Sequence, residues 1–525
     1  MPGKLICMKK KTIGKSTILF LLAAVLVGIL IVLKESVICT ASEQNDHVID
    51  SLSDLNGKRI GIQTGTSFDA AVREKMPEAH LEYYNGKADL LAALIGKKID
   101  AFIVDEAVAQ ILIRESKYVV YLPEYLDSYD FAQIFPKTRD GEQLRNQFNA
   151  FLEHLPEGTL DDLSVKWFSE NEADKTMPDI SRLEAKKGVL KLATESGYAP
   201  FEYMRDGKVV GYDMELAAMF CEYSGYGLDI IDMNFDGILP AIQTSKCDFA
   251  LAGISITPER AESVLFSKPN FSGGTVDMIH KENAEYNDSF WDSIIESFNK
   301  TFIRENRWQL FQKGIMTTLL ITIFAVLFGT ALGFVVFMSC RNGNPVANII
   351  TQFFMWLIQG MPMVVLLMIL FYVIFGSVAI NGVLVAIIGF TLTFGASVFG
   401  LLKTGVGAVG IGQYEGAYAL GYSERQTFYK IILPQAMPFV LPAYKGEIVS
   451  LIKSTAIVGY IAVQDLTKIG DIVRGRTYEA FFPLIAITVI YFALETLVGF
   501  GVGRISVNIN PKRRKESEIL KGIKH

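Results

Sequence analysis

The stretch Tyr414-Glu415-Gly416-Ala417-Tyr418-Ala419-Leu420-Gly421, with Ile431-Ile432-Leu433-Pro434 ten residues further on, lies in a loop between two long apolar segments. Glu415–Leu420 can form a helix, and Gly421 ends it because glycine adopts the left-handed conformation at little cost. A second helical stretch is expected to end at Leu433-Pro434, since the residue before a proline avoids helical geometry. Two short helices joined by a glycine turn suit docking on a soluble partner. A surface hairpin of no special role fits the same residues.

Long apolar runs surround this loop. Five of them can each cross a bilayer: Ile315–Met338, Ile349–Phe375, Val378–Leu402, Phe439–Val463 and Phe481–Val502. Basic residues gather at Arg341, Lys403, Arg425–Lys430 and Arg504–Lys515, which an extracytoplasmic start places in the cytoplasm, as the positive-inside rule requires. Half of the 525 residues are hydrophobic, 20% are charged and the net charge is −6, so a purely soluble protein and a nucleic-acid partner are both disfavoured.

The N-terminal segment, residues 1–44, is a basic stretch followed by the apolar run Ile18–Leu33. This run fits either a cleaved signal peptide or a signal anchor. In both cases the following segment is exported. Gly14-Lys15-Ser16-Thr17 ends like a phosphate-binding loop, but Lys9 stands where that motif needs a glycine. We therefore expect no nucleotide site, no catalytic residues and no bound cofactor in this chain.

The cytoplasmic loop resembles the EAA motif of permeases from ATP-binding-cassette (ABC) importers. Six positions match, namely Glu415, Ala417, Gly421, Ile431, Leu433 and Pro434, whereas Gly416 replaces the usual alanine. Gln426–Ala436, Gly360-Met361-Pro362 and Leu451–Thr455 resemble the polar amino-acid subgroup. The resemblance covers Trp308 to about Asn510. It implies an all-α permease domain (308–510) whose coupling loop (412–436) docks on a separate ATPase, with a basic cytoplasmic tail (511–525).

What this family resemblance implies extends to assembly and location. ATP and magnesium would be bound by the ATPase polypeptide. One chain encodes half a permease, so a homodimer in the lipid of a bacterial plasma membrane is expected. Five scattered cysteines and five histidines form no ligand cluster, so no metal site is expected. Cys221 and Cys247 could pair outside the cell, although two buried thiols are the simpler interpretation.

Between about residues 45 and 283 the charge density is ordinary, and strand-like runs alternate with amphipathic stretches. Arg59–Gln63, Ala101–Asp105 and Phe249–Ile254 read as strands, and Ala88–Ile95 and Met214–Tyr223 read as helices. This alternation predicts α/β layers. Residues 171–187 are polar and read as a linker, and 284–307 form a second linker.

Residues 188–283 resemble the first lobe of periplasmic amino-acid-binding proteins, carried by Thr194–Tyr203, Gly211-Tyr212-Asp213, Asn234–Gly237 and Ala252–Arg260. A guanidinium grips a carboxylate through parallel hydrogen bonds, so Arg260, with backbone donors near Gly253 and Ser255, is the candidate for the ligand α-carboxylate. Tyr198 and Phe235 offer aromatic faces to the ligand side chain. Glu195 stands where relatives often have an acidic residue facing that side chain, which suggests a polar or basic ligand.

Residues 45–170 resemble the second lobe. Gln63-Thr64-Gly65-Thr66-Ser67 lies between a strand and a helix, so Gly65, Thr66 and Ser67 are candidate ligand contacts through backbone amides. By resemblance Asp105 accepts the ligand α-ammonium, and Gly158–Trp167 forms the terminal helix. The second-lobe segment precedes the first-lobe segment here, the reverse of the family order. We interpret this as a circular permutation joined at 171–187; two truncated, separate domains are the alternative.

The function expected from these features is ATP-driven amino-acid import, with capture by a fused two-lobed α/β binding domain. The alternatives are a ligand-gated channel or an amino-acid-sensing receptor. In glutamate-receptor channels the pore interrupts the two lobes, whereas here all five runs follow both lobes. No signalling segment follows the last run.

Overall fold

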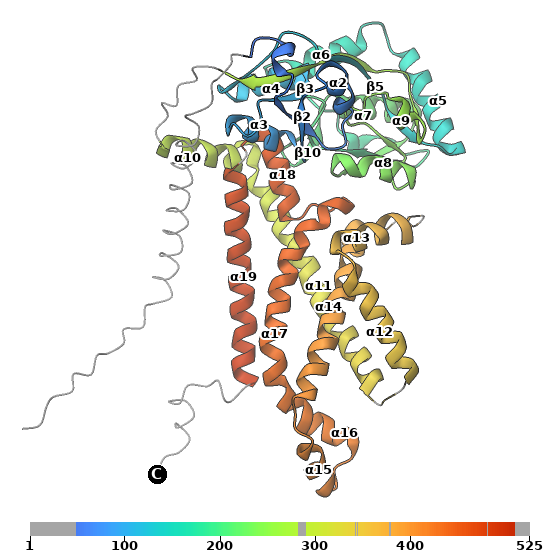
Figure 1. The fold of residues 1–525 in the computed structure, drawn as a ribbon. Coiled ribbons are helices and arrows are strands. Elements are labelled where there is room, and N and C mark those ends of the chain that lie inside the picture. Colours follow the sequence, from blue (N-terminus) through green and yellow to red (C-terminus); the bar gives the residue numbers. More distant parts are fainter. Residues whose placement is uncertain are drawn as a thin grey trace, which may run out of the picture.

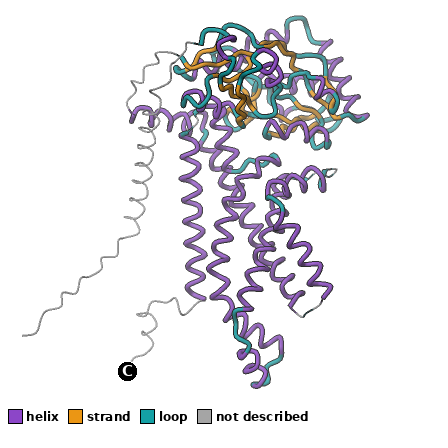
Figure 2. The backbone as a smooth tube through the Cα atoms, in the orientation of Figure 1, coloured by secondary structure: helices purple, strands orange, loops and turns teal. Residues whose placement is uncertain are grey.

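The structure, a computed structural model, describes residues 49–281 and 290–509 except 342, 344, 377, 379 and 480. The predicted signal or anchor (1–44) and the basic tail (511–525) lie outside the described residues. An α/β part sits at one end of a set of long helices (Figure 1). The hairpin of α15 (Gly412–Ala419) and α16 (Glu424–Thr427) sits at the other end (Figure 1). Figure 2 shows that the strands are confined to the first of these parts.

Two sheets form the cores of two lobes. The first sheet has the order β2-β1-β3-β14-β4, and β5 pairs with β14. Its strands are β1 (Arg59–Gln63), β2 (His80–Tyr84), β3 (Ala101–Asp105), β4 (Val119–Tyr121), β5 (Asp127–Phe131) and β14 (Phe271–His280). The second sheet has the order β11-β7-β12-β6-β13. Its strands are β6 (Ile134–Pro136), β7 (Val189–Thr194), β11 (Gly227–Asp232), β12 (Phe249–Ala250) and β13 (Val264–Phe266). A small ribbon of β8 (Gly197–Tyr198), β9 (Glu202–Arg205) and β10 (Lys208–Val210) flanks it.

Helices join the parallel strands of each sheet, as the alternation predicts. The first lobe in chain order carries α2 (Phe68–Lys75), α3 (Lys87–Ile95) and α4 (Glu106–Glu115), and the other carries α7 (Tyr212–Ser224), α8 (Phe235–Gln243) and the short α9 (Pro258–Ala261). β1 pairs in parallel with β2 and β3, and β7 pairs in parallel with β11 and β12. The carboxyl ends of these strands therefore lie at one edge of each sheet, where ligands bind in such folds.

Each sheet takes strands from both chain segments. β14 pairs antiparallel with β3, placing Val276 opposite Val104. β6 pairs antiparallel with β12 and β13. Two independent domains could not share strands in this way, because each sheet core would be incomplete.

The border between the lobes also differs from the predicted division at residues 45–170. From β6 onward the chain has already joined the other lobe, together with α5 (Arg139–His154) and α6 (Thr159–Phe168). The physical reason is burial of α6: Trp167 is fully buried, and its indole nitrogen donates to Glu215 of α7 over 2.6 Å. Cys221 and Cys247 are both free and buried.

Three unbroken helices are long and apolar enough to cross a membrane: α11 (Trp308–Arg341), α14 (Gly382–Gly407) and α19 (Phe482–Ile509). Two bent pairs pass the same test only if each is taken as one span. In the first, α12 (Pro345–Gly360) meets α13 (Met363–Met368) and η5 (Ile369–Ile374) at 107°. The predicted run Ile349–Phe375 is therefore no straight span, because Pro362 cannot continue the helix.

The second bent pair begins at Glu424, within the predicted coupling loop (412–436). α15 (Gly412–Ala419) is followed by Gly421 at φ +80°, which confirms the glycine turn. The predicted helix end at Leu433-Pro434 is wrong. α16 (Glu424–Thr427) continues through the π-helical η6 (Phe428–Ile432) into α17 (Leu433–Ser454). Pro434 lies inside this continuous run, directly after the π-helical turn, where the regular hydrogen-bond ladder is interrupted, as it is by a residue without an N–H.

α18 (Leu466–Thr477), which follows η7 (Thr455–Ile461) at 56°, joins the permease helices to both lobes. Lys468 donates to the side-chain oxygen of Asn234 over 2.7 Å, at the start of α8. Arg474 is paired with Asp89 of α3 in the other lobe. α10 (Phe290–Phe298) and η3 (Asn299–Ile303) connect the last sheet strand to α11 (Figure 1).

The shared strands generate a prediction about folding. A fragment of residues 45–283 should unfold in one cooperative thermal transition, because both sheets are complete. Residues 45–170 and 185–283 expressed separately should each lack this transition, because in each fragment both sheets are missing at least one strand. Circular dichroism melts of the three fragments test this. An independent cooperative melt of residues 185–283 alone would contradict it.

Candidate ligand-binding site

The predicted ligand residues come together in a cleft between the two lobes. Its walls are built from the segments that follow β1, β3, β7 and β12, so the strand ends of both sheets face it. Nine predicted residues line its cavity of about 30 Å³: Thr66, Ser67, Asp105, Glu195, Tyr198, Phe235, Gly253, Ser255 and Arg260. Gly65 does not line the cavity, but its carbonyl oxygen accepts a hydrogen bond from Arg260.

Arg260 bridges the lobes. It sits on α9, whose first turn is capped by the side chain of Thr257. One guanidinium nitrogen donates to the Ser255 carbonyl over 2.9 Å, and another donates to the Gly65 carbonyl over 2.9 Å. A guanidinium has five N–H donors, so donors remain for a carboxylate. Besides these two carbonyls, the Phe235 ring lies against the side chain, its centre 5.9 Å from the guanidinium carbon, and among the described residues no acid forms an ion pair with it.

Asp105 occupies the end of β3 and is 1% exposed. It is the residue before α4, yet its side chain makes no capping bond to that helix. Its Oδ1 is buried without a hydrogen-bond partner among the described residues. Burial raises the pKa of Asp105 to about 7, and the charge of Lys87 opposes this rise. An acceptor that the fold leaves unpaired in a cleft suits an ammonium ligand.

Aromatic rings form the remaining walls. Three rings line the cavity: those of Tyr198, Phe235 and Phe131, the last of which lies at the end of β5. Gly253 has φ +55°, and a β-carbon there would lie 2.4 Å from the Tyr198 ring, so only glycine permits this ring position. The N–H of Gly253 donates to Asp213 over 3.2 Å. This predicted backbone donor is therefore already engaged within the protein.

Sequence reasoning missed Lys87, Gln63 and Phe131, which also line the cleft. Lys87 is the first residue of α3 and is 7% exposed. A cation is unfavourable at a helix N-terminus and rare when buried, so a lysine after Asn85-Gly86 at the start of a predicted helix was the available signal. Gln63 begins the segment 63–67, for which the sequence predicted contacts by backbone amides and none by the Gln63 side chain.

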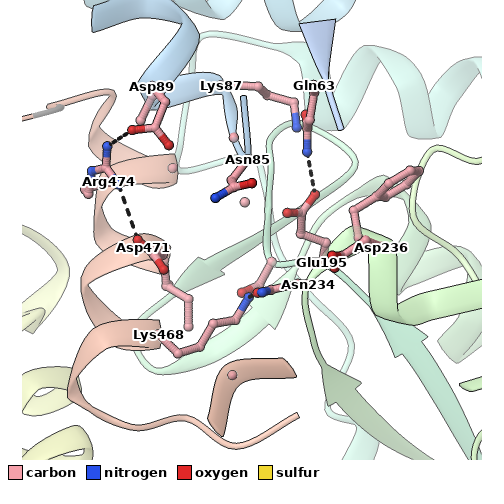
Figure 3. A pocket seen from close by; sticks show the side chains of 18 of the residues that line it. Gln63, Asn85, Lys87, Asp89, Glu195, Asn234, Asp236, Lys468, Asp471 and Arg474 are labelled. Atoms are coloured by element: carbon pink, nitrogen blue, oxygen red, sulfur yellow. Dashed lines mark hydrogen bonds and ion pairs between the residues drawn. The ribbon is translucent and has the colours of Figure 1, made fainter. Parts of the chain in front are cut away.

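A second, larger cavity of about 280 Å³ adjoins the cleft on the side of the permease (Figure 3). Four side chains, those of Gln63, Lys87, Glu195 and Phe235, line both cavities and separate them. The opposite wall consists of η7 and α18 and includes Tyr460, Lys468, Asp471 and Arg474. The cleft thus opens toward the permease helices.

The predicted coupling residues lie at the far end of the molecule from the cleft (Figure 1). Glu415, Gly421 and Pro434 are exposed, Ile431 and Leu433 are partly buried, and Ala417 is buried. Three apolar side chains of α15 and its ends stand in solvent: Ile411 at 76%, Tyr418 at 48% and Leu420 at 78% exposure. An exposed apolar patch of this kind is typical of a contact surface.

Comparison with known proteins supplies the family. Bacterial extracellular solute-binding proteins, family 3, match residues 190–440. A putative glutamine transport system permease protein of Rickettsia bellii is 32% identical over 193 residues, which cover 36% of this chain and 87% of that protein. The chain belongs to the amino-acid ABC transporter permeases.

Other relatives of this permease agree. A probable amino-acid ABC transporter permease protein of Bacillus subtilis is 29% identical, covering 35% of this chain and 81% of that protein. The crystal structure of an amino acid ABC transporter with histidines matches at a TM-score of 0.37 and 25% identity, over 42% of this chain and 99% of that chain. The relatives are transport permeases, and they do not support a channel or a receptor. This permease therefore combines a solute-binding domain and a transport domain in one chain.

The unpaired carboxylate generates a pH prediction. Asp105 binds an ammonium only when ionised, and its pKa is about 7. Affinity for the ligand should therefore hold above pH 7 and weaken as the pH falls below it, by up to about tenfold per pH unit. Titration calorimetry of the purified permease between pH 5 and 8.5 measures this.

The matched control is Asp277→Asn. Burial also raises the pKa of Asp277 to about 7, but this residue does not line the cleft. Asp277→Asn should keep the pH dependence, whereas Asp105→Asn should lose most affinity and the pH dependence with it. An unchanged pH profile in Asp105→Asn would remove Asp105 from the site.

Proposed function

We propose that this permease captures a polar amino acid outside the membrane with its own binding domain and passes it inward, driven by a separate ATPase. The observation that carries this proposal is the cleft, in which Arg260 and Asp105 face the same cavity and one Asp105 oxygen has no partner among the described residues. These two groups match the two charged ends of an amino-acid zwitterion. Each charge-assisted hydrogen bond contributes roughly 1.5–3 kcal/mol. Gripping both ends then accounts for much of a micromolar affinity, about −8 kcal/mol.

The proposal includes movement of the lobes. Gln63 donates to Glu195 across the cleft, and Arg260 donates to Gly65. The cavity of about 30 Å³ has room for only a few water molecules, which is less than an amino acid occupies. The lobes must part for the ligand to enter, and these two contacts break as they do.

The proposed partner is an ABC ATPase that contacts the hairpin of α15 and α16, where ATP and magnesium are bound by the partner alone. Its support is the exposed apolar side chains of the hairpin and the match to amino-acid ABC transporter permeases. We further propose a homodimer with two ATPase subunits, because the chain contains one such hairpin within its described residues. The binding domain then lies on the extracytoplasmic side and α15 on the cytoplasmic side of the plasma membrane.

Two variants separate binding from coupling. Gly421→Asp forces a side chain into a left-handed conformation and adds a charge at the proposed ATPase contact, so ligand binding should persist while transport collapses. Arg260→Ala should abolish ligand binding and leave ATPase assembly intact. Calorimetry and ligand-stimulated ATP hydrolysis, measured on the reconstituted complex, report the two properties.

Gly343→Asp is the matched control for Gly421→Asp. Gly343 has φ +71°, open space around it, and a place between α11 and α12 outside the hairpin. Normal coupling is expected in this variant. Normal transport by Gly421→Asp would show that the hairpin does not transmit ATP hydrolysis.

A further inference from the structure

Two charged side chains remain in the cleft once Arg260 and Asp105 are assigned to the ligand backbone. They are Lys87, from α3 of one lobe, and Glu195, from the end of β7 in the other. Both also line the larger cavity toward the permease. The part of the ligand that extends beyond its α-carbon must therefore meet a cation and an anion together.

Lys87 is buried without a bonded anion. Its ammonium lies 3.9 Å from the centre of the Tyr198 ring, and among the described residues it has no hydrogen-bond or ion-pair partner. Burial lowers its pKa, and the nearby carboxyls of Glu195, Glu202 and Asp105 oppose this. Burial raises the pKa of Glu202 well above its ordinary value, with Asp213 adding to the rise and the charge of Lys87 opposing it. A cation-π contact alone is weak compensation for a buried ammonium.

Glu195 is partly buried and accepts one long hydrogen bond, 3.5 Å, from the side-chain amide of Gln63. Figure 3 shows the side chains of Lys87 and Gln63 extending from the same lobe toward Glu195, with the Gln63 amide bonded to the Glu195 carboxylate. A carboxamide belonging to the protein itself thus sits against the acid of the cleft. This contact shows which chemistry fits beside Glu195.

We propose that Lys87 and Glu195 together select a ligand with a neutral carboxamide side chain, glutamine or asparagine. A carboxamide has an acceptor oxygen for the ammonium and donor hydrogens for the carboxylate, so it satisfies both groups at once. The cleft then contains two positive and two negative side chains around a ligand of zero net charge. Of the polar and basic ligands that Glu195 alone suggested, the structure assigns the neutral polar class.

Charged side chains fail for opposite reasons. A lysine or arginine ligand pairs with Glu195 but brings a second cation beside Lys87. A glutamate ligand pairs with Lys87 but brings a second carboxylate beside Glu195. Like charges in a desolvated site are strongly unfavourable. Charged amino acids are therefore excluded by electrostatic repulsion as well as by unsatisfied hydrogen bonds. This selection rests on the proposed function, because it assumes that Arg260 and Asp105 hold an amino acid.

The test measures binding of glutamine, asparagine, glutamate, lysine and arginine to the full permease in nanodiscs by titration calorimetry. Glutamine or asparagine should bind at least about tenfold more tightly than each charged amino acid. Lys87→Met should raise the affinity for lysine or arginine relative to glutamine by at least about tenfold. Glu195→Gln should shift the ratio of glutamate to glutamine upward by a similar factor.

Lys98→Met is the matched control, because Lys98 is exposed just beyond α3 and does not line the cleft. Its binding ratios should equal those of the unaltered protein. Tightest binding of lysine or arginine by the unaltered protein, or unchanged ratios in both Lys87→Met and Glu195→Gln, would overturn the carboxamide assignment while leaving amino-acid import standing. Absence of binding by all five amino acids would overturn the proposed function as well.

Discussion

A buried charge needs a partner of opposite sign, and this requirement organises the cleft. Arg260 bonds to two carbonyl oxygens, Asp105 keeps one oxygen without a partner among the described residues, and Lys87 lies over an aromatic ring. Such an arrangement contributes little to stability, since paired or apolar residues would pack better. Under the proposed function, the ligand supplies the missing partners. Closing the lobes around it is then favourable because both lobes contribute charges, Asp105 and Lys87 from one and Arg260 and Glu195 from the other.

The same requirement relates the cleft to the membrane part. α18 bonds to one lobe through Lys468 and Asn234, and to the other through Arg474 and Asp89. These polar contacts surround the larger cavity, whose remaining wall is the η7 segment of the bent pair. Arg474 also reaches Asp471 on its own helix, so it keeps a partner if the lobe moves away. A rotation of the lobes therefore directly changes contacts on a helix of the permease, and no separate binding protein is needed to transmit it.

Local chemistry made much of the fold predictable. β1 and β3 have the predicted bounds because each is a short, largely apolar run of strand length that ends at a polar residue. Gly421 has the predicted left-handed conformation because glycine adopts it at little cost. The predicted helix end at Pro434 was wrong because the helix continues through a π-helical turn just before this proline, a local change that the sequence pattern did not indicate. The strand exchange between lobes was missed at β6, whose three residues carry no periodic signal of their own. Pairing of that strand depends on partners more than 100 residues away.

The candidate site followed the same logic. Asp105 and Arg260 were identified through a resemblance, and the structure places both in the cleft, whereas Lys87 departs from any local rule for a helix start. Such departures are expected where function overrides stability. Its position over Tyr198 depends on Gly253, a residue from the other lobe, so no local pattern could have placed it.

The central claim is that one chain both captures the amino acid and transports it. The most direct measurement is uptake of radiolabelled glutamine into proteoliposomes that contain only this permease and its ATPase, with ATP inside and no soluble binding protein outside. The account predicts saturable, ATP-dependent uptake that Arg260→Ala abolishes. Uptake that appears only after a separate binding protein is added, and that persists in Arg260→Ala, would contradict it.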